Sequence, residues 1–336
     1  MAETSTRARP TLSARGQGIR RRLVHVAGRL LSAAILLLVG SLVVFFTIKS
    51  APGNPALSAL GEQATPAAIA AFEARHGLDK PLGVQYLGWL GNAVQGDFGV
   101  SMAMGGGQEI TSLMSTRLPA TLFLGGFALC LAISISLVLG ILAARRRGGL
   151  VDTAATSVSV LGISMPDFWL SYVLIFFFGL HLGWFPTYGY VSPGDDLAGA
   201  LHAAFLPALA IAAPMAAVFS RTLRAVLLET MNRPYVTAAR SFGLAGGFVF
   251  LHFTLRNALI PYLTVIGLQI RYILGGVVVV ERIFGIPGVG SFMVDGAMLR
   301  DMPVLLACTV TFLAIVLLVN TAMDALCTFL DPRRTR

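Results

Sequence analysis

The sequence predicts an all-helical polytopic membrane protein with six transmembrane helices and both termini in the cytoplasm. Of its 336 residues, 56% are hydrophobic and only 12% are charged, whereas a soluble domain has about 25% charged residues. Six apolar stretches are long enough to cross a bilayer, which takes about 20 residues. The basic residues collect in four patches beside these stretches, as cytoplasmic loops do.

The basic patches decide the predicted orientation. Lysine and arginine outnumber aspartate and glutamate by 25 to 16, and 18 of these 25 lie in the leader, at 145–147, at 221–256 and in the tail. Six spans with both ends inside place all four patches in the cytoplasm, whereas five or seven spans do not. The position of the patches beside apolar segments also argues against a nucleic-acid partner.

The chain divides into a basic cytoplasmic leader (1–29), a six-span region (30–330) and a cytoplasmic tail (331–336). The first span has a longer apolar core than the roughly 7–15 residues of a signal peptide, so we expect it to stay in the protein as an anchor. The predicted spans lie at 30–48, within 118–144, and at about 154–180, 202–219, 258–280 and 303–323, the last running on towards 330.

The long loop at 49–117 is expected outside the cytoplasm and is expected to contain short helices. Thr65 suits an N-cap, Pro66 a first turn and Gly77 a helix end. A further helix at 82–95 is expected to lie on the membrane surface, with one face at the level of the headgroups. That face carries Tyr86, Trp89, Leu90 and Ala93.

A short polar segment interrupts the apolar pattern inside the cytoplasmic coupling loop at 221–257. Asn232 is a good N-cap, Pro234 falls in the first turn, and Gly243 can end a helix in the left-handed conformation. We therefore predict a compact cytoplasmic helix between spans four and five, to which a partner protein binds. This interpretation is preferred to that of a passive basic loop. Tyr235 and Phe242 lie seven residues apart and thus on one side, and Ala238 and Ala239 allow a close approach.

Two charged residues fall inside predicted spans. Arg271 lies in the fifth span and Asp167 follows Pro166 in the third; such charges face protein or water rather than lipid. Arg271 either contacts an anionic solute in a translocation pathway or pairs with a carboxylate such as Asp167 or Asp324. Pro166 and Asp167 either line that pathway or have a buried structural role.

The sequence predicts that the chain is not an enzyme. It has no P-loop motif, and neither of its two lysines, Lys49 and Lys80, follows a glycine loop. Its five histidines and three cysteines lack the spacing of a metal site. We expect no catalytic residue, metal or cofactor on this chain.

Several motifs taken together resemble the permease subunits of ABC importers, in the branch that carries dipeptides, oligopeptides or nickel. Thr237-Ala238-Ala239 followed by Gly243 resembles the family's cytoplasmic Glu-Ala-Ala loop, with threonine in place of glutamate, and Pro261 stands eighteen residues after the glycine, as in the longer form of this branch. Other similar motifs follow in order: Gly96-Asp97-Phe98-Gly99, Leu118-Pro119-Ala120-Thr121, Ser164 with Pro166 and Phe168, Leu182-Gly183-Trp184-Phe185-Pro186, Phe284-Gly285-Ile286-Pro287-Gly288 and Asp331-Pro332-Arg333.

The resemblance implies a subunit of a bacterial or archaeal cytoplasmic membrane that works with three kinds of partner. A second, similar permease completes the pathway, two ATPase subunits hold ATP and Mg and dock on the cytoplasmic helices, and an extracytoplasmic binding protein delivers peptides or a related small solute. Pro261 would act as the hinge into span five. The residues implied in coupling to the ATPases are Tyr235, Thr237, Ala238, Ala239, Arg240, Phe242 and Gly243.

Two other functions remain open from the residues alone. A proton-coupled secondary transporter would use Asp167 and Arg271 and would work without an ATPase. A membrane scaffold would carry no solute. The lack of a detectable inverted repeat disfavours the secondary transporter.

Overall fold

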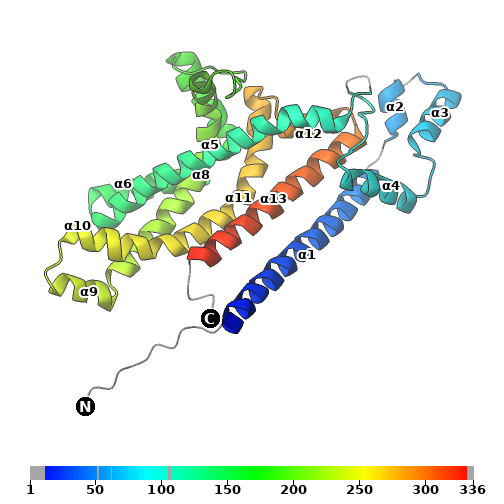
Figure 1. The fold of residues 1–336 in the computed structure, drawn as a ribbon. Coiled ribbons are helices and arrows are strands. Elements are labelled where there is room, and N and C mark those ends of the chain that lie inside the picture. Colours follow the sequence, from blue (N-terminus) through cyan, green and yellow to red (C-terminus); the bar gives the residue numbers. More distant parts are fainter. Residues whose placement is uncertain (1–11, 51–52, 62, 105–106, 331–336) are drawn as a thin grey trace.

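The computed structural model describes residues 12–50, 53–61, 63–104 and 107–330, and it is dominated by helices (Figure 1). The long helices are α1 (Leu12–Ser50), α5 (Ile110–Arg145), α8 (Leu197–Met231), α11 (Arg256–Phe284) and α13 (Met302–Leu330). The short ones are α2 (Pro55–Leu60), α3 (Pro66–His76), α4 (Leu82–Val94), α6 (Leu150–Ser164), α7 (Asp167–Leu174), α9 (Pro234–Ser241), α10 (Gly246–Val249) and α12 (Val289–Met298), with π-helices η1 (Ile175–His181) and η2 (Phe250–Leu255).

The polytopic membrane class is confirmed. Within the described residues, five helices are long and apolar enough to cross a membrane, and two sharply bent helix pairs raise the number to as many as seven. The predicted six lies within this range. The first 11 and last six residues, which belong to the predicted leader and tail, lie outside the described part of the chain; α1 itself begins at Leu12, well inside the predicted leader.

The predicted third span, at about 154–180 with an interruption at Pro166 and Asp167, is sharply bent at that interruption. The chain bends by 109° between α6 and the run Asp167–His181. Met165 is extended, with φ −93° and ψ 123°, because the residue before a proline is disfavoured in the helical region. Pro166 has no N–H to continue the α6 hydrogen-bond ladder, so a new helix starts at Asp167.

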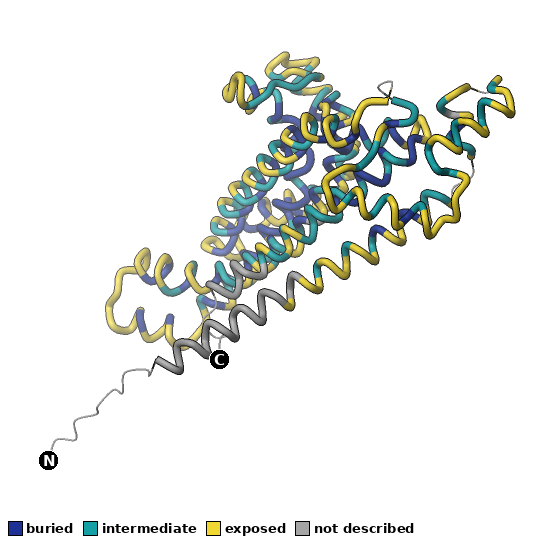
Figure 2. Tube along the Cα trace, turned by 45° about the vertical axis from the view of Figure 1, so that its right-hand side comes forward, coloured by how far each residue is buried: buried dark blue, intermediate teal, exposed yellow. Residues whose placement is uncertain are grey.

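Helix α8 forms the centre of the bundle. It runs unbroken through Pro207 and Pro214 and extends the predicted fourth span (202–219) to Met231, so the first third of the predicted coupling loop is helix. Figure 2 shows the buried residues concentrated along this central region. The buried α8 side chains include Leu206, Ile211, Met215, Phe219, Leu223 and Leu227.

Small residues allow the neighbouring helices to approach α8 closely. A Cβ added at Gly140 of α5 would lie about 3.0–3.1 Å from Leu223 and from the carbonyl oxygen of Ser220. The hydroxyls of Ser159 on α6 and Ser220 on α8 are hydrogen-bonded at 2.9 Å. Close packing of small residues with buried hydroxyl pairs is typical of helix contacts inside membranes.

The segments between α1 and α5 form a lobe (α2, α3 and α4) at one end of the bundle, and α9 lies at the other (Figure 1). We call it the outer lobe because it lies in the loop predicted to be outside the cytoplasm. The capping of α3 is as predicted: the Thr65 side chain accepts from the Ala68 N–H, Pro66 is in the first turn, and Gly77 has φ +63°.

The side chains predicted to share one face of α4 do share it, but that face does not lie against lipid headgroups. Tyr86 is 6% exposed and packs with Phe45 of α1 and Leu306 of α13. Its hydroxyl is hydrogen-bonded to Ser41 at 3.0 Å. The aromatic face of α4 is therefore covered by transmembrane helices of the same chain.

Candidate docking helix and its connection to the core

The predicted cytoplasmic helix exists as α9, but its N-cap is Arg233 and not Asn232. Asn232 instead ends α8, and its N–H donates to the Glu229 carbonyl at 3.2 Å. Arg233 has the extended backbone of a cap, with φ −70° and ψ 143°, and its carbonyl accepts from the Val236 and Thr237 N–H groups. The Asn232 prediction failed because α8 continues to Met231, which leaves Asn232 to serve the preceding helix.

The C-terminal end of α9 follows the prediction. Gly243 has φ +77°, its N–H donates to the Arg240 carbonyl at 2.9 Å, and the Leu244 N–H donates to the Ala239 carbonyl at 3.4 Å. These two bonds form a Schellman motif, which satisfies carbonyls left free at the end of a helix. A glycine fits here because it adopts positive φ without steric cost.

One face of α9 packs inward. Val236 is fully buried and Ala239 is 6% exposed, and together with Val249 of α10 and Phe253 of η2 they form a small core. The structure therefore corrects the expectation that both alanines face a partner: Ala239 holds α9 against the chain, and only Ala238 is exposed.

The opposite face of α9 is open. Phe242 is 86% exposed and Tyr235 43%, and the next segment adds the exposed side chains Leu244 and Phe248. Exposed apolar side chains gathered in one place mark an interaction surface. The predicted contact residues that are exposed are Tyr235, Thr237, Ala238, Arg240, Phe242 and Gly243.

Two further contacts join the elements before and after α9 to neighbouring helices, and sequence reasoning missed both. The guanidinium of Arg145, at the end of α5, lies 4.3 Å from the centroid of the Phe250 ring. Asp152 at the start of α6 forms an ion pair with Arg224 of α8 at 2.6 Å. The residues of each pair are far apart in sequence, so no local pattern indicates them.

Pro166 and Asp167 lie at the start of α7, and Asp167 faces α11. Its Oδ1 accepts a hydrogen bond from the Tyr272 hydroxyl at 3.0 Å. A Cβ on Gly276 would lie 2.7 Å from its Oδ2, so that glycine leaves room for the carboxylate. The side chains of Arg271 and Asp324 lie outside the described residues, and the expected pairing of Arg271 stays a prediction.

Pro261 does not break α11. The helix continues from Arg256 to Phe284 with Pro261 inside it. The departure from α-helical geometry lies just before α11, in the π-helix η2. The role of Pro261 as a hinge therefore stays a prediction, with η2 as a second irregular point beside it.

A buried carboxylate missed by sequence reasoning shapes the far end of α11. Glu281, the first residue after the predicted fifth span, is fully buried. It accepts hydrogen bonds from the Thr121 hydroxyl of α5 at 2.7 Å and from the Ser291 N–H of α12 at 2.9 Å. Thr121 in turn accepts from the Val289 N–H at 2.8 Å, so this cluster joins α5, α11 and α12.

Comparison with known proteins gives two matches to one family of membrane proteins. Residues 136–336 match the family described as the binding-protein-dependent transport system inner membrane component, and residues 22–125 match the N-terminal part of such components. The chain belongs to this family. The first match contains α9 and all of the core helices except α1 and most of α5.

Relatives of this permease family cover nearly the whole chain. A probable peptide ABC transporter permease of Sinorhizobium fredii is 33% identical over 92% of this chain and 98% of its own length. An oligopeptide transport system permease of Bacillus subtilis is 37% identical over 92% and 98%. A putative peptide transport system permease of Brucella abortus is 35% identical over 91% and 96%. With its apolar helices, the chain is a multi-pass inner-membrane permease component.

Proposed function

We propose that this chain is the permease subunit of an ATP-driven importer and forms half of a translocation pathway for peptides or a related small solute. A second permease subunit forms the other half, and an extracytoplasmic binding protein supplies the solute. The names of the relatives support the solute class. The chain has six spans with both termini in the cytoplasm of a bacterium or archaeon, as its basic patches favour.

The observation that carries the proposal is the construction of α9. A helix of eight residues has one face packed on α10 and η2 and the other exposed, and it joins α8 directly to the segment that leads into α11. Both of these long helices belong to the main core. A push on α9 is therefore transmitted to two transmembrane helices at once.

ATP and Mg belong to two partner ATPases in this proposal. Closure of these subunits moves α9 and its counterpart on the second permease together and switches the pathway between inward- and outward-facing states. Among the described residues, no group of three or more His, Cys, Asp or Glu side chains is placed to hold a metal ion. In this proposal Asp167, at the α7–α11 contact, lines the translocation pathway.

The experiment compares two matched substitutions in a tagged full chain expressed with its partner genes. Ala238→Arg adds bulk and charge to the exposed face of α9, and we expect loss of co-purifying ATPase and of ATP-dependent peptide uptake in vesicles. Ala71→Arg makes the same change on exposed α3 at the other end of the molecule and should leave ATPase association unchanged. Normal ATPase association in the Ala238→Arg complex contradicts the docking role.

The secondary-transporter alternative gives a different result in the same vesicles. A proton-coupled carrier using Asp167 and Arg271 would accumulate solute with this chain alone and would stop when the proton gradient is collapsed. We expect no accumulation without the ATPases.

A further inference from the structure

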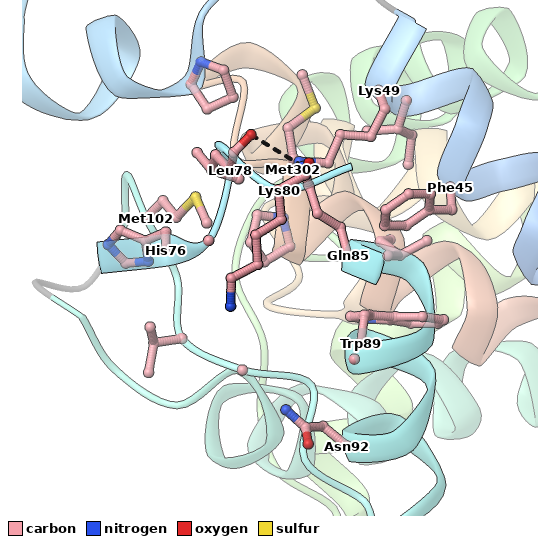
Figure 3. A pocket seen from close by; sticks show the side chains of 18 of the residues that line it. Phe45, Lys49, His76, Leu78, Lys80, Gln85, Trp89, Asn92, Met102 and Met302 are labelled. Carbon is pink, nitrogen blue, oxygen red and sulfur yellow. Dashed lines mark hydrogen bonds between the residues drawn. The ribbon is translucent and has the colours of Figure 1, made fainter. Parts of the chain in front are cut away.

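A cavity of about 520 Å³ lies between the outer lobe and the ends of two transmembrane helices (Figure 3). It is lined by the last turn of the apolar segment Leu31–Ser50 and by the first residues of Met302–Met323. It therefore sits where the hydrocarbon layer ends. Its volume falls in the range of about 300–1,000 Å³ found for small-ligand sites.

The charged side chains that line this cavity are basic. The chain has only two lysines, Lys49 and Lys80, and both line it, although one ends α1 and the other precedes α4. Arg75 lines it as well, and the described lining residues include no aspartate or glutamate; Glu73 lines an adjoining hollow that shares Lys49. Burial and the nearby Arg75 lower the pKa of His76, which also lines the cavity.

The rest of the wall is apolar and aromatic. Phe45, Ile48 and Leu306 come from the transmembrane helices and Trp89 from α4. The indole N–H of Trp89 is buried and has no hydrogen-bond partner within the described structure.

The cavity adjoins a lipid-facing surface. Beside the face that packs on α13, α1 exposes apolar side chains, including Leu38 and Leu42, which lie eleven and seven residues before Lys49 and therefore on its side of the helix. In a membrane these side chains contact acyl chains. A lipid lying along α1 thus has its headgroup at the level of Lys49, whose Nζ lies 5.9 Å from the centroid of the Phe45 ring.

We infer that this cavity binds the headgroup of an anionic phospholipid, with the phosphate between Lys49 and Lys80 and the glycerol and first acyl carbons against Phe45, Ile48 and Leu306. The apolar wall distinguishes this occupant from a soluble anion or an acidic protein loop, which would use the charges alone. The inference is independent of the proposed transport function, because it concerns the outer lobe and not α9.

The test uses the two lysines as reporters. The full chain is placed in phosphatidylcholine vesicles with or without phosphatidylglycerol, treated with an amine-acetylating reagent, and analysed by mass spectrometry. We expect phosphatidylglycerol to slow acetylation of Lys49 and Lys80 by about tenfold and to leave the N-terminal amine unchanged. Equal labelling in both vesicles overturns the inference. Equal protection by glycerol 3-phosphate or inorganic phosphate would show a soluble-anion site, and protection only by added peptide would show a cargo site; either result also overturns it.

Matched variants separate this site from general charge attraction. The Lys49→Gln, Lys80→Gln double variant should retain about tenfold less phosphatidylglycerol in native mass spectrometry, whereas Lys49→Arg, Lys80→Arg should retain it. Arg146→Gln, Arg147→Gln removes the same charge at two exposed positions elsewhere and should behave as the parent chain. Equal lipid loss in the lysine-to-glutamine and arginine-to-glutamine variants contradicts a defined site.

Discussion

Asp152 and Arg224 form a bidentate ion pair that joins the start of α6 to α8. Arg224 Nε donates to Oδ1 at 2.6 Å and Nη2 donates to Oδ2 at 2.7 Å. Oδ2 also accepts from the Gly148 N–H at 2.9 Å. Arg224 lies about two helical turns before the end of α8, so the pair ties α6 to the helix that leads directly into α9.

Removing the charge of Asp152 should destabilise the protein. Its side chain is only 7% exposed, and hydrogen bonds to charged groups are stronger than those between neutral groups. We expect Asp152→Asn to lower the free energy of unfolding, seen as a lower melting temperature of the purified chain. Glu229→Gln is the control, because the Glu229–Arg233 pair is exposed on both sides and such pairs contribute at most about 1 kcal/mol. Equal losses in the two variants would contradict the assignment.

A side chain at Gly243 should weaken the end of α9 through backbone conformation alone. A Cβ there meets no atom within 4 Å, but φ is +77°. A left-handed residue other than glycine costs about 1–2 kcal/mol. We expect Gly243→Ala to speed amide hydrogen exchange in residues 235–244. Gly246→Ala, where φ is ordinary and space is also open, should leave the exchange unchanged; faster exchange there too would mean that bulk and not φ is responsible.

Neighbouring alanines of α9 should respond differently to the same substitution. Ala239 is packed against Val249 and Phe253, so Ala239→Arg should detach α9 and expose residues 232–255 to proteolysis. Ala238 is exposed, so Ala238→Arg should leave the proteolytic pattern unchanged. Limited proteolysis of the two purified variants checks this, and identical patterns would show that the two faces are not distinct.

The buried Thr121 hydroxyl should matter more than an exposed hydroxyl of α5. It donates to Glu281 and accepts from the Val289 N–H, so Thr121→Val leaves two buried polar groups short of a partner. Each such loss costs about 1–3 kcal/mol, and the melting temperature should fall accordingly. Thr116→Val removes an exposed hydroxyl that bonds only within its own helix, and we expect it to melt like the parent chain. Parent-like melting of Thr121→Val would exclude a stabilising role for this cluster.

Predictions that depend on neighbouring residues in sequence were the most accurate. Thr65, Pro66 and Gly77 bound α3, and Pro234 and Gly243 bound α9, because capping is decided within a few residues by local hydrogen bonds and φ. Asn232 was assigned wrongly because two helices compete for it, and the length of α8 depends on its burial in the bundle.

Predictions that depend on a partner surface were less accurate. The helical period placed Tyr86 and Trp89 on one face of α4, but the surface covering that face is α1 and α13. Pro166 indicated an interruption, but not a bend of 109°, because the angle follows from how α7 packs on α8 and α11. Ala238 and Ala239 look alike in sequence, and only Val249 and Phe253 distinguish them.

The sequence by itself determined the membrane class, the approximate positions of the apolar helices, the capped helix α9 and the family to which the chain belongs, because composition, periodicity and caps act over short distances. Only the tertiary structure decided which face of α9 is free, that Asp152 meets Arg224, that Glu281 is buried, and that Lys49 and Lys80 share one cavity. Each of these contacts joins residues separated by many positions in the chain, and which distant groups meet depends on the packing of whole helices.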